Sequence, residues 1–177
     1  MKQSLLSTLF GERPFPANDL LTQTAVDRLL RLNDRTEEYG MVLTPADARE
    51  LVETRGHALK ETGRIEIGSG ILERLIAIFS DSPYLWQANY AASLHRMTED
   101  FYRLKNELPD TVGDDELLCE LKYSFDQRCR GSFELLEGVE FDRMSRNVRQ
   151  GRSYREGREI ETDLYYVQCD GDEEDDD

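Results

Sequence analysis

The sequence has 177 residues, with 22 Lys and Arg against 37 Asp and Glu, a formal net charge of −15, and 38% hydrophobic residues. That length suits one domain with a modest core. The chain contains no apolar run of about 18 residues, so we expect no transmembrane helix. Its first ten residues lack the features of a signal peptide. An acidic surface repels phosphate and anionic lipid, which disfavours nucleic acid and membranes as partners of the body of the protein.

The three cysteines, Cys119, Cys129 and Cys169, are an odd number without close paired spacing. This pattern argues against a disulfide framework and against a structural zinc site. We therefore expect a cytoplasmic protein.

Residues 1–17 contain glycine and proline among apolar residues, which predicts an irregular N-terminal arm. We favour an arm that docks on the core, and the alternative is a segment that binds a partner. The first helix is predicted to begin at Asn18, a good N-cap residue, and to run to about Glu38.

A second helix has a stronger start signal. Thr44 is suited to the N-cap, Pro45 to the first helical position, and Asp47 lies three residues after the cap. We predict that this helix runs to about Thr62 and that Gly63 ends it.

The segment 64–67 alternates over too few residues to decide between strand and helix. Residues 70–79 are the most apolar segment of the chain and predict a central buried helix.

The longest helix is predicted to begin with Ser82 as N-cap and Pro83 as its first residue, and to end before Pro109. Large apolar side chains recur along it at steps of four and three: Trp86, Tyr90, Leu94, Met97, Phe101, Leu104 and Leu108. This stripe could form a dimer seam. We favour packing inside the core, because other helices of the chain can cover it.

Two further helices are expected before the composition changes. Asp114, Asp115 and Glu116 place negative charge at the start of one, where the helix dipole favours it. Ser132 can cap a short last helix. The sequence therefore predicts an all-α fold, a compact bundle of about five or six helices over residues 18–142.

Residues 143–177 form a charged tail. One short strand is possible at 160–167, and the end, residues 170–177, consists of seven acids and one glycine, a composition that cannot fold alone.

Metal-ligating patterns are weak in this chain. The acids near residues 110–116 lack the order of an EF-hand loop, and helix-start electrostatics explains most of them. His57 shares a helix face with Glu53 and Glu61, and His95 with Glu99, which we interpret as surface salt bridging. Neither a nucleophile elbow, a dinucleotide fingerprint nor a Walker motif occurs. We expect no metal, no cofactor and no catalytic residue.

An arginine at every third position is the main functional signal of the sequence. The six are Arg143, Arg146, Arg149, Arg152, Arg155 and Arg158. In an α-helix they would spiral around the axis, whereas in a polyproline-II segment they would line one edge that suits phosphates or carboxylates. The alternative is a solvated connector whose charges pair with the acidic body or the acidic tail.

Several short segments together resemble a small bacterial family, a domain of unknown function. They are 63–66, 79–84, 100–107, 113–117, 125–126 and 131–132. The resemblance covers residues 18–140 and implies a bacterial cytoplasmic setting. It implies no activity, cofactor or catalytic residue.

Two hypotheses for function follow. The first is a non-enzymatic interaction or accessory protein that holds an unidentified protein partner on a helical face or groove, with a homodimer as a possible arrangement. The second is a polyanion-binding module whose arginine track is masked by the acidic tail, and a metal-dependent enzyme comes third.

Overall fold

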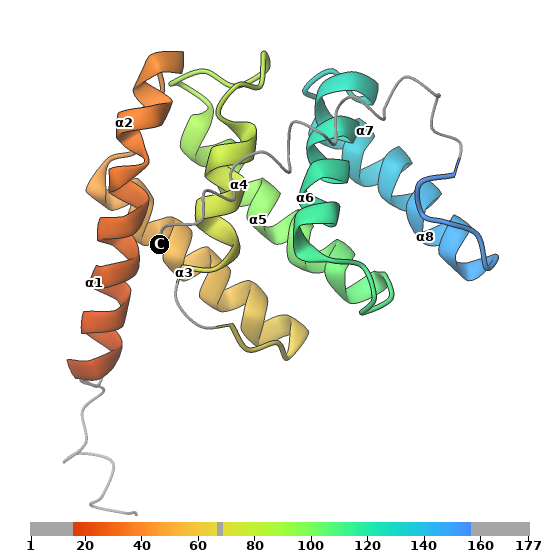
Figure 1. Cartoon of the computed structure of the whole chain (residues 1–177), viewed down its shortest axis with the longest axis horizontal. Helices are drawn as coiled ribbons and strands as arrows, with labels where there is room; N and C mark the ends of the chain where they lie inside the picture. The colour runs from red at the N-terminus through yellow and green to blue at the C-terminus, as the bar shows by residue number, and fades with distance from the viewer. Residues whose placement is uncertain (1–15, 67–68, 157–177) are drawn as a thin grey trace, which may run out of the picture.

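The computed structural model describes residues 16–66 and 69–156, and these form two layers of helices (Figure 1). In chain order the helices are α1 (Pro16–Arg31), α2 (Asn33–Thr36), η1 (Glu37–Tyr39), α3 (Pro45–Thr62), α4 (Ile71–Phe79), α5 (Tyr90–Glu107), α6 (Asp114–Tyr123), η2 (Ser124–Arg128), α7 (Phe133–Leu135), η3 (Leu136–Glu140) and α8 (Phe141–Arg149). The described residues contain no strand, and the predicted all-α fold is confirmed. The candidate strand at 160–167 and residues 1–15 of the predicted arm at 1–17 lie outside them, and residues 16 and 17 belong to α1.

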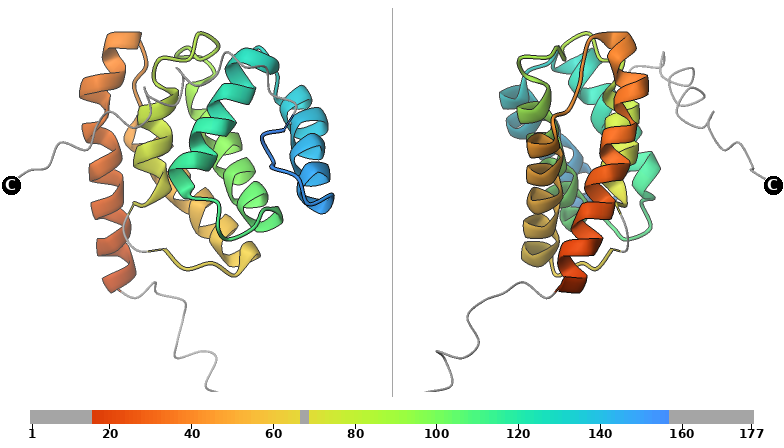
Figure 2. Two further views of the ribbon diagram at one scale, coloured as in Figure 1. Left: turned by 45° about the vertical axis from the view of Figure 1, so that its right-hand side comes forward. Right: turned by 90° about the vertical axis from the view of Figure 1, so that its left-hand side faces the viewer.

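One layer consists of α1, α4 and α6, and the other of α3, α5 and the run from α7 to α8 (Figures 1 and 2). The core lies between them and is built from the apolar faces of all the long helices. Because α5 lies in the middle of its layer, its outer side faces solvent between α3 and η3. Within the described residues, none of the helices combines the length and the apolar character that crossing a bilayer requires.

The second predicted helix is confirmed at both ends. The Thr44 hydroxyl accepts a hydrogen bond from the Asp47 backbone N–H at 3.1 Å, and the Asp47 carboxylate accepts one from the Thr44 N–H at 2.9 Å. Gly63 ends α3 in the left-handed conformation. The central apolar helix, α4, is also confirmed, and five of its nine residues are buried.

The predicted first helix is divided into α1, α2 and η1, and α1 begins two residues before Asn18. The break follows Arg31. The Asn33 side chain there pairs with the backbone of Leu43, donating to its carbonyl oxygen at 2.9 Å and accepting from its N–H at 2.8 Å. This pairing fixes the connector that leads to α3.

The predicted helix start at Ser82 is wrong, because residues 82–89 form turns and α5 begins at Tyr90. The Ser82 hydroxyl does not cap a helix and instead donates to Asp126 at 2.6 Å. Asn89 stabilises the turn, since its side chain accepts from the Trp86 N–H at 2.9 Å and donates to the Tyr84 carbonyl at 3.1 Å. Trp86 is 57% exposed and does not belong to the buried stripe. The rest of that stripe, from Tyr90 to Leu108, is buried.

The last helix begins as predicted, with Ser132 as N-cap accepting from the Leu135 N–H at 3.3 Å. It is longer than predicted, because α7, η3 and α8 follow one another without a break to Arg149. The change of composition after residue 142 therefore falls inside α8.

Candidate functional site

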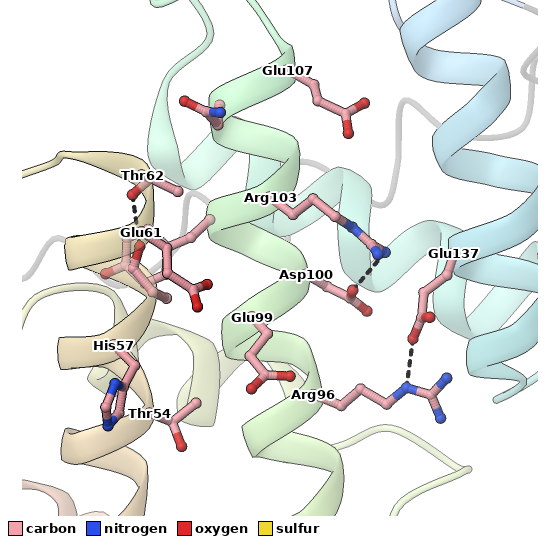
Figure 3. A pocket seen from close by; sticks show the side chains of 13 residues that line it. Thr54, His57, Glu61, Thr62, Arg96, Glu99, Asp100, Arg103, Glu107 and Glu137 are labelled. Atoms are coloured by element: carbon pink, nitrogen blue, oxygen red, sulfur yellow. Dashed lines mark hydrogen bonds and ion pairs between the residues drawn. The ribbon is translucent and has the colours of Figure 1, made fainter.

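A groove of about 550 Å³ opens on the outer side of α5, between α3 and η3 (Figure 3). Its thirteen lining residues come from these three elements: Thr54, His57, Ala58, Glu61, Thr62, Arg96, Glu99, Asp100, Tyr102, Arg103, Asn106, Glu107 and Glu137. Helical spacing explains the arrangement. On α5, residues 96, 99, 100, 103, 106 and 107 follow one another at steps of three and one, so they share one side of the helix.

The groove carries more negative than positive charge. Its acids are Glu61, Glu99, Asp100, Glu107 and Glu137, and its permanent cations are Arg96 and Arg103. Glu61 and Glu99 are exposed and make no ion pair with any residue that the structure describes. Some other exposed acids of this chain have cationic partners, as Asp115 has in Arg74 at 2.5 Å. The side of the groove next to α3 is therefore an uncompensated acidic wall.

Asp100 is the most unusual group of the site, because this ionisable residue is only 3% exposed. Arg103 donates to Oδ1 at 2.8 Å, and Oδ2 is buried without a hydrogen-bond partner. Burial raises the pKa of Asp100 to about 7, opposed by Arg103 and supported by Glu137. The carboxyl therefore exchanges a proton near neutral pH.

The two arginines of the groove connect α5 to the last helical run. Arg96 donates to Glu137, and its guanidinium lies 4.6 Å from the ring centroid of Phe133. The hydrogen bond that Arg96 donates to Glu137 raises the pKa of Arg96. Arg103 lies 4.9 Å from the ring centroid of Phe141. Each guanidinium is thus held by a carboxylate and an aromatic face.

This arrangement can bind positive charge at several points along α5. Its carboxylates are spread along the groove, and no three His, Cys, Asp or Glu side chains within 16–66 and 69–156 lie close enough together to hold one metal ion. An extended ligand with more than one cationic group fits that spacing better than a single compact ion.

The structure separates the arginines of the predicted track. Arg143 pairs with Glu140 at 3.0 Å and with Glu120 at 3.5 Å, and Arg155 pairs with Glu116 at 2.8 Å. The other described members, Arg146, Arg149 and Arg152, are exposed. Arg158 lies outside the described residues. The first three are on α8 and the next two in the turns after it, so the described five line neither a single helix nor one extended edge.

Of the histidines, only His57 lines the groove. His95 pairs with the Thr54 hydroxyl through Nδ1 at 2.7 Å. Cys129 is buried, and burial raises the pKa of its thiol to about 11, which suppresses the reactive thiolate.

Sequence reasoning missed the residues that distinguish the groove. A signal was present, because Arg96, Asp100 and Arg103 follow at steps of four and three beside the apolar stripe of α5. That spacing places a carboxylate between two guanidinium groups on one helix face. What the sequence did not contain was the position of Glu137, which comes from a helix packed alongside.

Comparison with protein families gives a match over residues 28–154 to the family described as "Family of unknown function (DUF6323)". The chain belongs to this family. The match includes α3, α5 and η3, so every lining residue of the groove lies inside the family domain. This confirms the predicted resemblance to a domain of unknown function. No curated protein and no solved structure matches the chain.

Proposed function

We propose that this protein is an interaction protein whose groove holds a positively charged segment of a partner protein. The observation that carries the proposal is the uncompensated acidic wall: Glu61 and Glu99 lack ion-pair partners among the described residues, beside a buried Asp100 with one vacant oxygen. Carboxylates left without counter-charges along a groove attract a ligand that brings them.

The net charge of the chain supports the same partner chemistry. A formal charge of −15 steers cations toward the protein and repels polyanions. The arginine track gives less support to polyanion binding, because Arg143 and Arg155 are engaged by acids of the helical body. A polyanion would have to compete with these internal carboxylates.

Fluorescence anisotropy with labelled ten-residue peptides tests the proposal on the full chain. A peptide that alternates basic and small polar residues should bind, and its acidic counterpart should not. The double variant Glu61→Gln/Glu99→Gln should weaken binding of the basic peptide by roughly tenfold, since each removed charge contributes up to about 1 kcal/mol. Binding should also weaken steeply as salt rises.

The matched control is Glu37→Gln/Glu38→Gln, which removes the same charge from exposed acids of η1, outside the groove. It should change the affinity less than twofold. Equal losses in the two double variants would show that only net charge matters, and the groove would then have no special role.

A further inference from the structure

The two arginines of the groove occupy sites of the same design. Each guanidinium contacts one carboxylate and one aromatic face, and each aromatic ring comes from the last helical run: Arg96 with Glu137 and Phe133, Arg103 with Asp100 and Phe141. Figure 3 shows the two arginine–carboxylate pairs. A carboxylate beside an aromatic ring suits a guanidinium, because the N–H groups donate to the carboxylate and the planar face stacks on the ring.

The site at Asp100 is incompletely used. Arg103 donates only to Oδ1, while Oδ2 is buried and has no partner. A guanidinium bound side by side with the carboxylate would donate to both oxygens. Arg103 reaches the site from its own helix three residues away, and its side chain is 47% exposed, so it can swing outward into solvent. Its departure would leave both oxygens of the Asp100 carboxyl without a hydrogen-bond partner.

We propose that Asp100 and Phe141 form a binding site for the guanidinium of an arginine side chain in the bound segment, and that Arg103 occupies this site when the segment is absent. The inference rests on the proposed function, and it specifies arginine over lysine. An ammonium group has no planar face to stack on Phe141 and makes no paired donation to a carboxylate.

The charges around the site favour such an exchange. The groups that act on Asp100 are Arg96, Glu99 and Arg103 of α5 and Glu137 of η3. Arg96 is already paired with Glu137. When Arg103 leaves, Asp100 and Glu99 remain without a neutralising partner among these groups, and the incoming guanidinium replaces the lost charge.

The first test is chemical rescue of the full-length variant Arg103→Ala by free amino acids, with thermal unfolding as the measurement. Free L-arginine should raise the Tm of this variant more than an equal concentration of L-lysine does. In Arg28→Ala, which removes an exposed arginine of α1, a helix that contributes no lining residue to the groove, the two amino acids should act alike. Equal effects of arginine and lysine on Arg103→Ala would overturn the proposal.

The second test does not depend on the folding of Arg103→Ala. The unmodified chain should bind an arginine-containing peptide at least threefold more tightly than the peptide with lysine at the same positions, and Asp100→Asn should abolish that preference. If both peptides bind equally, the groove still holds basic segments but the guanidinium site is wrong. If rescue by arginine occurs and neither peptide binds, the site is correct and the proposed partner class is wrong.

Discussion

Arg143 on α8 donates a hydrogen bond from Nη1 to the main-chain carbonyl oxygen of Tyr154 at 3.0 Å. The same nitrogen donates to the carbonyl oxygen of Glu156 at 2.8 Å, and the Asn147 side chain donates to that oxygen at 2.9 Å. Two side chains of α8 therefore hold the backbone that follows it against the helix. An arginine of the predicted polyanion track is here a structural clamp.

Arg143→Ala should destabilise the fold strongly. Glu120 is fully buried and Glu140 nearly so, and the substitution removes a positive charge that both contact. Breaking a buried ionic contact from one side costs about 3–5 kcal/mol. Denaturant unfolding measures the loss, and hydrogen exchange at 152–156 should accelerate because the clamp is gone.

Arg146→Ala is the matched control, because Arg146 lies three residues further on α8 and is exposed. Its effect should stay within about 0.5 kcal/mol. Comparable losses for the two variants would mean that the contacts of Arg143 contribute little to stability.

Asp100→Asn should stabilise the protein above pH 7 and flatten its dependence on pH. Burial raises the pKa of Asp100 from 3.8 to about 7, so the folded state binds a proton that the unfolded chain has already released between these values. The stability contributed by this group is present below pH 4 and is lost as the pH rises through about 7. The free energy of unfolding that this group contributes differs between low pH and pH above 7 by about 2–4 kcal/mol. Urea unfolding at pH 5 and pH 8 measures it.

The control for this pH dependence is Asp142→Asn, which changes an exposed carboxyl on α8. It should leave the difference between pH 5 and pH 8 as it is in the unmodified chain. If Asp100→Asn also leaves that difference unchanged, Asp100 is not the group that titrates near neutral pH.

Local signals predicted the parts of the fold that local contacts determine. The ends of α3 were predicted correctly, because their signals act within one helical turn. These signals are the capping box of Thr44 and Asp47 at the start and the left-handed Gly63 at the end. Ser82 and Pro83 have the same N-cap and first-position signal as Thr44 and Pro45, without the acid three residues on. The Ser82 hydroxyl instead bonds to Asp126, 44 residues further along the chain. This contact between distant residues prevails over the capping signal, and a short stretch of sequence does not reveal it.

The candidate site was harder to predict for the same reason. Asp100 has an ordinary helical position, and its burial and raised pKa depend on the packing of α7, η3 and α8 against α5. The spacing of the arginine track was real, but α8 ends at Arg149, and the acids of α6 then engage Arg155. Periodicity gave the positions of the arginines and not their partners.

Trp86→Ala should change the free energy of unfolding by less than about 1 kcal/mol. The prediction follows from its 57% exposure, which contradicts its expected place in the buried stripe. Met97→Ala is the comparison, because Met97 is fully buried on α5. This variant should lower the free energy of unfolding by about 2–5 kcal/mol. Circular dichroism during urea unfolding measures both, and a large loss for Trp86→Ala would place its ring in the core.

Gly70→Ala and Gly56→Ala should have opposite effects. Gly70 has φ of +51°, and an added Cβ would lie 2.7 Å from Glu66 Oε2 and 3.1 Å from Arg55 Nη2. Glu66 Oε2 also accepts from the Tyr102 hydroxyl at 2.7 Å, so the methyl group would disturb a half-buried ionic network as well as strain the backbone. We expect the free energy of unfolding to fall by roughly 2–4 kcal/mol.

Gly56 is inside α3 with open space around its Cα, and Gly56→Ala should stabilise the protein by roughly 0.5–1 kcal/mol. Thermal and urea unfolding should show the two variants on opposite sides of the unmodified chain. A neutral Gly70→Ala would show that this turn and its ion pair adapt to a side chain.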